Sequence, residues 1–424
     1  MAVEQQIEYA IVGGGISGLT LAIALLERGL SVHIYEQAKE FGEIGAGVSF
    51  TPNSVQAMKL CHPGIYDAFE KVCTRNLWPS KQGVWFDFYD GLDTDKNASS
   101  VFSIRNDLGQ NAVHRANFLD ELVKLMPEGK ASFGKRLDDI IQNEDGRYTL
   151  KFLDGSSAIA DAVLGCDGIK SKAREIMFGS DHPCVVPSYT FKNAYRAMLP
   201  METAIAAIGK EKAENACMHL GRGAHLLTFP VRHGQMMNVV GFCGTDQPWK
   251  DMRKLTAPAT REDALRDFAG FGPVVTSLLQ LAEPTLEIWG IFDLGVNPPP
   301  SYVKDRICLV GDAAHATTPH HGAGAGMCIE DAAVLCALLA DERAQTRSGA
   351  QAAIATFEAV RKERGDWLVQ SSRFNANVYQ RQAPGIGDDF AKIEAELNRK
   401  NGMVANVNVE EMCREAIKEF SKRL

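Results

Sequence analysis

The sequence has little of what marks nucleic-acid-binding and membrane proteins. Lys and Arg number 45 against 53 Asp and Glu, and the formal net charge is -8 at pH 7. This acidic balance argues against nucleic acid or an anionic membrane as the main partner. No stretch approaches the roughly 20 uninterrupted apolar residues of a membrane span, and the sequence contains no repeat or low-complexity tract. We therefore expect a soluble globular protein.

The ten cysteines form no CxxC pair and show no zinc-ligand spacing. Several lie in apolar runs, such as Cys308 in RICLVGD and Cys336 in AAVLCALL. This usage predicts buried, reduced thiols and no metal site. The apolar segment AIVGGGISGLTLAIALL has no basic residue before it and no small-residue cleavage site after it, which argues against an export signal. Together these features predict a cytoplasmic protein.

What the sequence does contain begins with a βαβ pattern. Residues 8–12 predict a strand, a glycine turn follows, residues 17–28 predict a helix, and residues 31–35 predict a second strand. Such a unit predicts a parallel sheet. The length of 424 residues suggests roughly two or three domains.

The turn of this unit fits the G-x-G-x-x-G fingerprint of dinucleotide-binding folds. Gly13 makes the tight turn, Gly15 lets a pyrophosphate approach the backbone, and Gly18 lets the helix pack closely on the strand. The helix start at Ser17 offers free N–H groups and a partial positive charge to the phosphates. Glu36 ends the second strand, where its carboxylate can accept hydrogen bonds from ribose hydroxyls. The pattern predicts a dinucleotide site and suits NAD and FAD alike.

The rest of the chain changes character along its length. Residues 181–292 are rich in aromatic and β-branched runs, such as HLLTFPV and MNVVGF, with one helix expected after Thr260. This predicts a mostly antiparallel sheet inserted between parts of the nucleotide-binding domain. The other expected elements are helices at 52–60, 115–126 and 329–340, strands at 83–91, 148–152, 162–166 and 306–310, and a helical region from about 352 onward.

Two further motifs follow predicted strands. They are Cys166-Asp167-Gly168-Ile169-Lys170-Ser171-Lys172-Ala173-Arg174 and Gly311-Asp312-Ala313-Ala314-His315, which leads into ATTPHHGAGAG at 316–326. With the glycine turn, they resemble in order and spacing the three fingerprints of the single-component (group A) FAD-dependent aromatic hydroxylases. The similarity is greatest to the salicylate-hydroxylase-like monooxygenases and spans roughly residues 5–375.

The resemblance implies an α/β fold with a Rossmann-like FAD-binding domain, an inserted, mostly antiparallel β-sheet substrate domain and a C-terminal helical segment. We expect the FAD-binding domain to comprise residues 1–75, 111–180 and 293–375. The expected substrate-domain parts are 76–110 and 181–292, and C-terminal helices are expected at 376–424.

The resemblance also implies which residues hold FAD. Asp312 would hydrogen-bond the ribityl chain, Arg115 would contact the ribityl and phosphate portion, and Asp167 belongs to a motif associated with both FAD and the nicotinamide nucleotide. Asp312 could instead cap a turn, and Arg115 could be a surface ion-pair partner. The helix start at Gly322, Gly324, Ala325 and Gly326 would face the flavin pyrimidine and stabilise negative charge on the reduced ring. The segments expected near the ring system are Gly45-Ala46-Gly47 and Pro52-Asn53.

The chemistry that the resemblance implies has two halves. NADH or NADPH reduces FAD, and O2 then forms a C4a-hydroperoxyflavin whose distal oxygen is attacked by an electron-rich phenol. The protein must position the ring, exclude water and favour the phenolate. Because phenols titrate at about pH 10, a nearby base or cation must lower that pKa by several units.

Four residues are candidates on the substrate side. His225, in GAHLLTFP, lies where related phenol hydroxylases place a base, although Phe229 replaces a tyrosine that some relatives carry. Arg196, in AYRAMLP, matches an arginine that certain fungal dearomatising relatives use to hold a phenolate, and it could also pair with a carboxylate. His320 would line the pocket and Pro319 would lie against the flavin. An ordinary core histidine and a solvent-facing arginine are the alternative interpretations.

Several readings stay open at this point. The first is hydroxylation of a small salicylate-like phenolic acid, with or without loss of CO2. The second is hydroxylation or oxidative dearomatisation of a larger polyketide phenol or phenolic aldehyde. A flavoprotein dehydrogenase or oxidase and a non-enzymatic nucleotide sensor are alternatives from other classes. The sequence does not distinguish NADH from NADPH, or a monomer from a homodimer.

Overall fold

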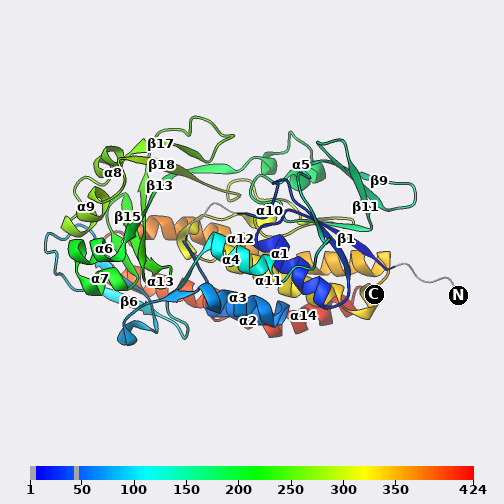
Figure 1. Cartoon of the computed structure of the whole chain (residues 1–424), viewed down its shortest axis with the longest axis horizontal. Helices are drawn as coiled ribbons and strands as arrows, with labels where there is room; N and C mark the ends of the chain where they lie inside the picture. Colours follow the sequence, from blue (N-terminus) through cyan, green and yellow to red (C-terminus); the bar gives the residue numbers. More distant parts are fainter. Residues whose placement is uncertain (1–5, 43–46) are drawn as a thin grey trace.

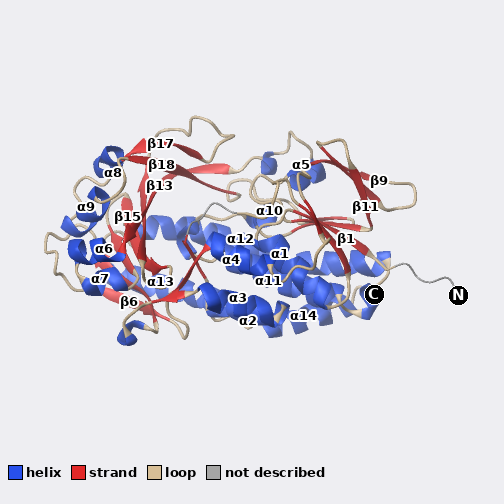
Figure 2. Cartoon of the chain, in the orientation of Figure 1, coloured by secondary structure: helices blue, strands red, loops and turns tan. Residues whose placement is uncertain are grey.

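The computed structural model describes residues 6–42 and 47–424. Two large sheets occupy opposite ends of the molecule, and a layer of helices lies between and beneath them (Figures 1 and 2). Gly45 and Ala46, which the sequence analysis places near the flavin ring, lie outside the described residues. Within the described residues, no helix has both the length and the apolar character needed to cross a membrane.

The first sheet contains the predicted βαβ unit. β1 and β2 pair in parallel and helix α1 (Ile16–Glu27) connects them, which confirms that unit. The strand order is β19-β20-β12-β1-β2-β8, with β19 antiparallel to β20 and the other pairs parallel. The strands are β1 (Glu8–Val12), β2 (Ser31–Tyr35), β8 (Ala131–Ser132), β12 (Ala162–Gly165), β19 (Val303–Lys304) and β20 (Ile307–Leu309). The three glycine-containing motifs follow the neighbouring strands β1, β12 and β20, so all three lie at one edge of this sheet, where open parallel sheets bind ligands.

The second sheet is mostly antiparallel, as predicted. Its order is β17-β18-β13-β16-β15-β14-β5-β6, and the pair β14–β5 is parallel. The strands are β5 (Val84–Asp90), β6 (Phe102–Arg105), β13 (Ser188–Pro200), β14 (Cys217–Leu220), β15 (Ala224–Val231), β16 (Met236–Gly244), β17 (Thr256–Thr260) and β18 (Thr285–Asp293). β5 thus pairs with a strand more than 100 residues later in the chain and carries β6 at the sheet edge.

The prediction of one helix within residues 181–292 is wrong. Helix α8 (Arg261–Asp267) is the expected one, and Thr260 caps it. Three further helices are α6 (Met201–Ile208), α7 (Lys210–Glu214) and α9 (Pro273–Gln280). α6 and α9 bury apolar side chains against the outer face of the second sheet. Their apolar runs are about two helical turns long, and periodicity alone does not separate a strand from a helix in so short a run.

The remaining helices link the two ends of the molecule. α12 (Arg347–Tyr379) is the longest, with 33 residues. Arg347, its first residue, pairs with Asp161 beside the first sheet. The ring of Tyr379, its last residue, lies 5.2 Å from the ring of His225 in the second sheet. The other helices are α2 (Pro52–Cys61), α3 (Pro63–Val72), α4 (Arg115–Val123), α5 (Lys172–Phe178), α10 (Asp312–His315), α11 (Gly324–Leu339), α13 (Phe390–Ala405), α14 (Val409–Ser421) and the short η1 (Pro79–Lys81), η2 (Pro183–Val185), η3 (Pro319–His321) and η4 (Glu342–Ala344).

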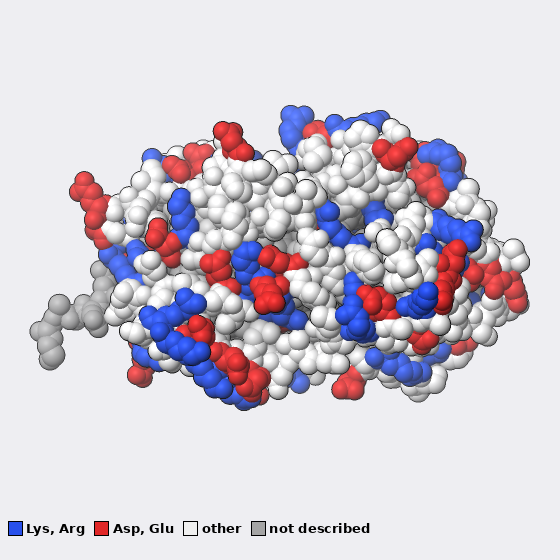
Figure 3. All heavy atoms as spheres, turned by 180° about the vertical axis from the view of Figure 1, so that it is seen from behind, with Lys and Arg blue, Asp and Glu red and all other residues white. Residues whose placement is uncertain are grey.

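Two small sheets complete the fold. An antiparallel sheet contains β9 (Leu137–Gln142), β10 (Tyr148–Phe152) and β11 (Ser157–Ala160), and a second contains β3 (Gly47–Ser49), β4 (Thr74–Arg75) and β7 (Asn111–His114). The ten cysteines are free, and all but the partly exposed Cys413 are buried, which agrees with the predicted thiols. On the face shown in Figure 3, charges of both signs are interspersed.

Candidate active site

A large cavity, of about 1070 Å³, is lined by residues from both sheets. The three motifs of the first sheet form one side of it, and strands of the second sheet form the other. Fifteen of the predicted site residues line it: Gly13, Gly15, Ser17, Glu36, Gly47, Arg115, Asp167, Arg196, His225, Asp312, Pro319, His320, Gly322, Gly324 and Ala325. The remaining two, Gly18 and Gly326, lie behind the wall at helix contacts.

The glycine turn after β1 is shaped by close backbone contacts. Gly13 has φ +102°, and a Cβ there would lie 2.5 Å from the Cys166 carbonyl oxygen. Its N–H donates to the Tyr35 carbonyl at 2.9 Å, which joins the turn to the end of β2. A Cβ on Gly18 would lie 1.9 Å from the Gly13 carbonyl oxygen. Gly18 therefore serves the close helix packing that its position in the fingerprint predicts.

Glu36 lies at the end of β2 and faces the same turn. One carboxylate oxygen accepts the Gly14 N–H at 2.6 Å, and the other accepts the Ala38 N–H at 2.7 Å. These bonds fix the side chain against the turn. Because each carboxylate oxygen can accept more than one hydrogen bond, lone pairs remain for a ribose hydroxyl.

The second motif forms a capped loop. The Asp167 carboxylate accepts from the Ser171 hydroxyl at 2.6 Å and from two backbone N–H groups at the start of α5 at 2.7 and 2.9 Å. Burial raises the pKa of Asp167, although these hydrogen bonds oppose the rise. Arg174 donates to the Ala313 carbonyl at 2.8 Å and so connects this loop to the third motif. Asp167 therefore lines the cavity while capping a helix.

The third motif brings two helix starts into the cavity wall. Gly311 has φ +64°, and a Cβ there would lie 2.8 Å from Ser17 Oγ at the start of α1. Helix α11 begins at Gly324, which agrees with the start that the resemblance implies and lies before residue 329, where the residue pattern places it. Small residues let this first turn approach α2. A Cβ on Gly326 would lie 2.0 Å from the hydroxyl of Ser54 in α2. The first turns of α1 and α11 thus both border one cavity, where their free N–H groups favour negative charge.

This half of the cavity fits FAD. The glycines leave room for a ligand against the backbone at two helix starts, and a carboxylate lies beside the first of them. A pyrophosphate matches the first helix start, and a reduced flavin ring, which carries negative charge, matches the second. Asp312, the first residue of α10, and Arg115, the first residue of α4, line the space between.

Two buried histidines line the other half of the cavity. His225 is fully buried, stacks on Phe242 at 4.9 Å and lies 5.4 Å from His320, measured between ring centroids. None of the four ring nitrogens has a hydrogen-bond partner among the described residues. Burial, followed by the charge of Lys192, lowers the pKa of His225 to about 3. Burial and the neighbouring His225 also hold the pKa of His320 well below its usual value. Both rings are therefore neutral at pH 7.

Arg196 provides a cation in the wall of the same half. Its guanidinium lies 4.3 Å from the centroid of the Trp289 ring, and its buried Nε has no partner within the described part of the chain. Burial, and then the charge of Arg115, lowers its pKa to about 10, so it stays charged at pH 7. A buried, charged donor without an acceptor is suited to an anionic ligand.

The remaining lining of this half is apolar, and sequence reasoning missed most of it. The lining includes Trp85, Phe86, Met218, Phe242, Trp289 and Tyr379. These residues come from four strands and the end of α12, and no local motif joins them. Phe229 does line the cavity, and its ring touches Gly47, where a Cβ would lie 2.6 Å away. The alternation along β15 that places His225, Leu227 and Phe229 on one face is the one signal that sequence provides here.

Comparison with known proteins agrees with this geometry. The family model described as an FAD binding domain matches residues 6–372. An FAD-dependent monooxygenase of Monascus ruber, pigN, is 44% identical over 432 residues, covering 99% of this chain and 98% of that protein. The 6-methylsalicylate 1-monooxygenase atA of Aspergillus terreus is 39% identical over 427 residues, covering 99% and 94%. A solved salicylate hydroxylase substrate complex superposes with a TM-score of 0.86 at 32% identity, covering 97% and 98%.

These matches define the class of the protein as a flavoprotein of the predicted α/β fold. The chain belongs to the FAD binding domain family and is an FAD-dependent monooxygenase similar to salicylate hydroxylase. The resemblance inferred from the three sequence motifs is therefore confirmed.

Proposed function

We propose that this monooxygenase hydroxylates a phenol that carries a neutral carbonyl group, as in a phenolic aldehyde or ketone. Hydroxylation at a substituted ring carbon would make the reaction an oxidative dearomatisation. NADH or NADPH would be the reductant and O2 the oxidant. The observation that carries the proposal is the polar lining of the substrate half, which combines one guanidinium with two neutral imidazoles.

FAD, when bound, supplies the chemistry that activates O2, so that one oxygen atom enters the substrate and the other leaves as water. We assign its adenosine end to Glu36 and the α1 start, its ribityl chain to Asp312 and Arg115, and its pyrimidine to the start of α11. The elements that carry these residues fall in 1–75, 111–180 and 293–375, which we propose as the FAD-binding domain. We assign the substrate to the cavity wall formed by 76–110 and 181–292.

Arg196 would hold the substrate oxygen as a phenolate. A phenol titrates at about pH 10, and a hydrogen-bonded guanidinium in a buried site lowers such a pKa because it favours the charged form. The phenolate is the electron-rich form that the oxygen transfer needs. Trp289 holds the guanidinium in place by stacking against it at 4.3 Å.

His225 and His320 would bind the second polar group of the substrate. A base with a pKa of about 3 is poorly matched to a phenol, so His225 in this state is better suited to hydrogen bonding than to proton abstraction. A neutral imidazole can donate one hydrogen bond from its N–H to a carbonyl oxygen. Two neutral rings do not compensate the desolvation of a carboxylate as a cation would. This difference favours an aldehyde or ketone at the histidine end.

A phenolic acid is the second candidate. It is supported by Arg196, which can pair with a carboxylate, and by the similarity to a salicylate hydroxylase and to a 6-methylsalicylate 1-monooxygenase. Hydroxylation at the carbon bearing the carboxylate would then release CO2.

Matched substrates separate the two candidates. We would measure NADH and NADPH oxidation, O2 uptake and product mass with salicylaldehyde, a hydroxyaryl ketone and salicylate. The proposal expects the carbonyl compounds to stimulate consumption and gain one oxygen atom. Turnover of salicylate alone, with CO2 release, would establish the acid as the substrate class. Consumption with H2O2 release and no oxygenated product from any phenol would contradict both candidates.

A further inference from the structure

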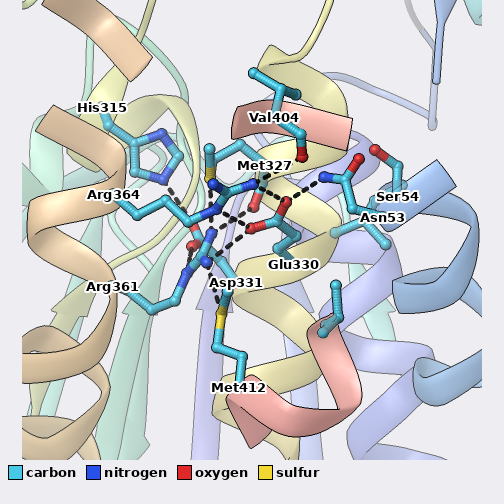
Figure 4. Close-up of polar contacts among 12 residues, drawn as sticks. Asn53, Ser54, His315, Met327, Glu330, Asp331, Arg361, Arg364, Val404 and Met412 are labelled. Atoms are coloured by element: carbon cyan, nitrogen blue, oxygen red, sulfur yellow. Dashed lines mark hydrogen bonds and ion pairs between the residues drawn. The ribbon is translucent and has the colours of Figure 1, made fainter. Parts of the chain in front are cut away.

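A cluster of buried ionic side chains lies beneath the start of helix α11 (Figure 4). We call it the α11 ion cluster. Its members are His315, Glu330, Asp331, Arg361 and Arg364. Arg361 and Glu330 are 0% exposed, and Asp331 is 1% exposed. The cluster does not line the cavity, so none of its members touches substrate.

Arg361 is the centre of the cluster. Its Nη1 lies 2.8 Å from a Glu330 carboxylate oxygen, and its Nε lies 2.7 Å from an Asp331 carboxylate oxygen. Arg364 binds both oxygens of Glu330 at 2.8 Å. His315 Nε2 lies 2.6 Å from the second oxygen of Asp331. The adjacent carboxylates of α11 thus bind His315 from α10 and the two arginines from α12.

The carboxylates also reach two segments that border the flavin half of the cavity. Asp331 accepts the N–H of Gly311 at 3.1 Å, which fixes the turn that carries Asp312. Glu330 accepts from the side-chain amide of Asn53, in the first turn of α2. The cluster therefore connects the start of α11, the Asp312 turn and the start of α2.

The same arginines attach the C-terminal helices. Arg364 donates to the carbonyls of Met403 and Val404, at the end of α13, at 3.1 and 3.2 Å. Arg361 contacts the sulfur of Met412 in α14 at 3.0 Å. The helices from residue 390 onward are thereby coupled to the flavin half through the fully buried Arg361 and the partly buried Arg364.

Charge neutralisation in the cluster has a consequence for a ligand at the start of α11. Burial would raise the pKa of both carboxyls, but the arginines and His315 lower them, and that of Asp331 falls to about 2. Both groups are therefore ionised. Without Arg361, the charge beneath the helix start would be one unit more negative, which opposes the negative charge that the helix N–H groups favour in the cavity.

We propose that Arg361 is a positioning residue for the flavin, which bridges Glu330 and Asp331 and so sets both FAD affinity and flavin reduction potential. Affinity depends on the bridge because it holds the start of α11 and the Asp312 turn in register. The potential depends on it because Arg361 offsets one of two buried negative charges. The inference rests on the proposed placement of the flavin at the start of α11.

The test uses two variants with opposite charge changes. Arg361→Met removes a positive charge and Asp331→Asn removes a negative one, and each breaks the bridge. FAD dissociation constants of the reconstituted protein are expected to rise on the order of tenfold in both, by analogy with residues that orient the ligands of a metal without touching the metal. The reduction potential of the bound flavin is expected to fall in Arg361→Met and to rise in Asp331→Asn. Arg361→Lys, which keeps the positive charge, should keep the reduction potential near the wild-type value.

Arg347→Met is the matched control. It breaks the ion pair of Arg347 with the buried Asp161 at the other end of α12, at 2.7 Å, and should leave both FAD readouts unchanged. Equal loss of stability in all variants, with wild-type FAD affinity and potential, would overturn the proposal and leave a structural role only. If Arg361→Met fails to fold, Asp331→Asn alone decides by the sign of its potential shift. Asp312→Ala separates the two levels: wild-type FAD affinity in that variant would contradict the ribityl contact on which the proposed flavin placement rests.

Discussion

The two halves of the cavity treat their buried polar groups in opposite ways. In the flavin half, the carboxylates of Glu36 and Asp167 each accept at least two hydrogen bonds, and behind its wall the carboxylates and arginines of the α11 ion cluster are paired with one another. In the substrate half, Arg196 Nε and the ring nitrogens of His225 and His320 have no partner among residues 6–42 and 47–424. The flavin half is thus preorganised by the protein, and the substrate half is completed by what binds there.

The difference indicates where substitution should cost most. A buried polar group without a partner costs about 1–3 kcal/mol, and a substrate that satisfies it recovers that energy on binding. In the flavin half, the carboxylates of Glu36 and Asp167 already have protein partners, so loss of one group there is shared among several neighbours. We therefore expect single substitutions in the substrate half to have the larger effects on the reaction.

The largest effect is expected for Arg196→Met. Removing the cation should lower kcat/KM for a phenolic substrate by about a hundredfold or more, the usual size for loss of one donor to a developing oxyanion. The rate should recover as the pH approaches the phenol's own pKa of about 10, since free phenolate then forms without help. FAD content, measured by absorbance, should stay at the wild-type level. A pH profile parallel to that of the wild type would exclude the phenolate role.

Asp312→Ala tests the flavin half. Loss of a charge-assisted hydrogen bond of about 1.5–3 kcal/mol should raise the FAD dissociation constant roughly 10- to 150-fold. Fluorescence titration of the apoprotein with FAD measures it. Glu283→Ala is a suitable control, because this exposed carboxylate lies far from the three motifs in the sequence. Wild-type FAD affinity in Asp312→Ala would reject the contact of its side chain with the ribityl chain.

How far the sequence predicts each half follows from the same contrast. The flavin half depends on short motifs in which each glycine and carboxylate acts on its immediate neighbours, so Gly13 and Glu36 could be found from spacing, and Asp312 from the family resemblance of its motif. The capping role of Asp167 and the partners of Glu330 could not, because they depend on how loops and helices meet. The substrate half is assembled by strand register over long separations. There the residue pattern predicted only the alternation around His225, and Arg196, His320 and Pro319 came from the family resemblance.

The histidines should also make the substrate half sensitive to acid. His225 has a folded pKa of about 3 against about 6.5 when unfolded, so the unfolded state binds more protons between these values. The free energy of unfolding therefore has its full value above about pH 6.5, and below that pH it falls by about 1.4 kcal/mol per pH unit because of this group. His225→Leu should remove about 2 kcal/mol of the destabilisation between pH 7 and pH 5. Urea unfolding of the holoenzyme at both values measures this, and an unchanged pH dependence would contradict a buried neutral ring.

The smallest effect is expected for Phe229→Tyr, which adds the hydroxyl that some relatives carry. Phe229 pairs with Asn238 across β15 and β16, and the buried Asn238 Nδ2 has no partner within the described residues. The new hydroxyl can accept from that amide, which offsets the cost of crowding the ring against Gly47. We expect KM to change by less than about fivefold, or about 1 kcal/mol, with kcat unchanged. A large rise in kcat with a shifted pH profile would instead mean that a histidine–tyrosine relay can operate, and that proton transfer limits the wild-type enzyme.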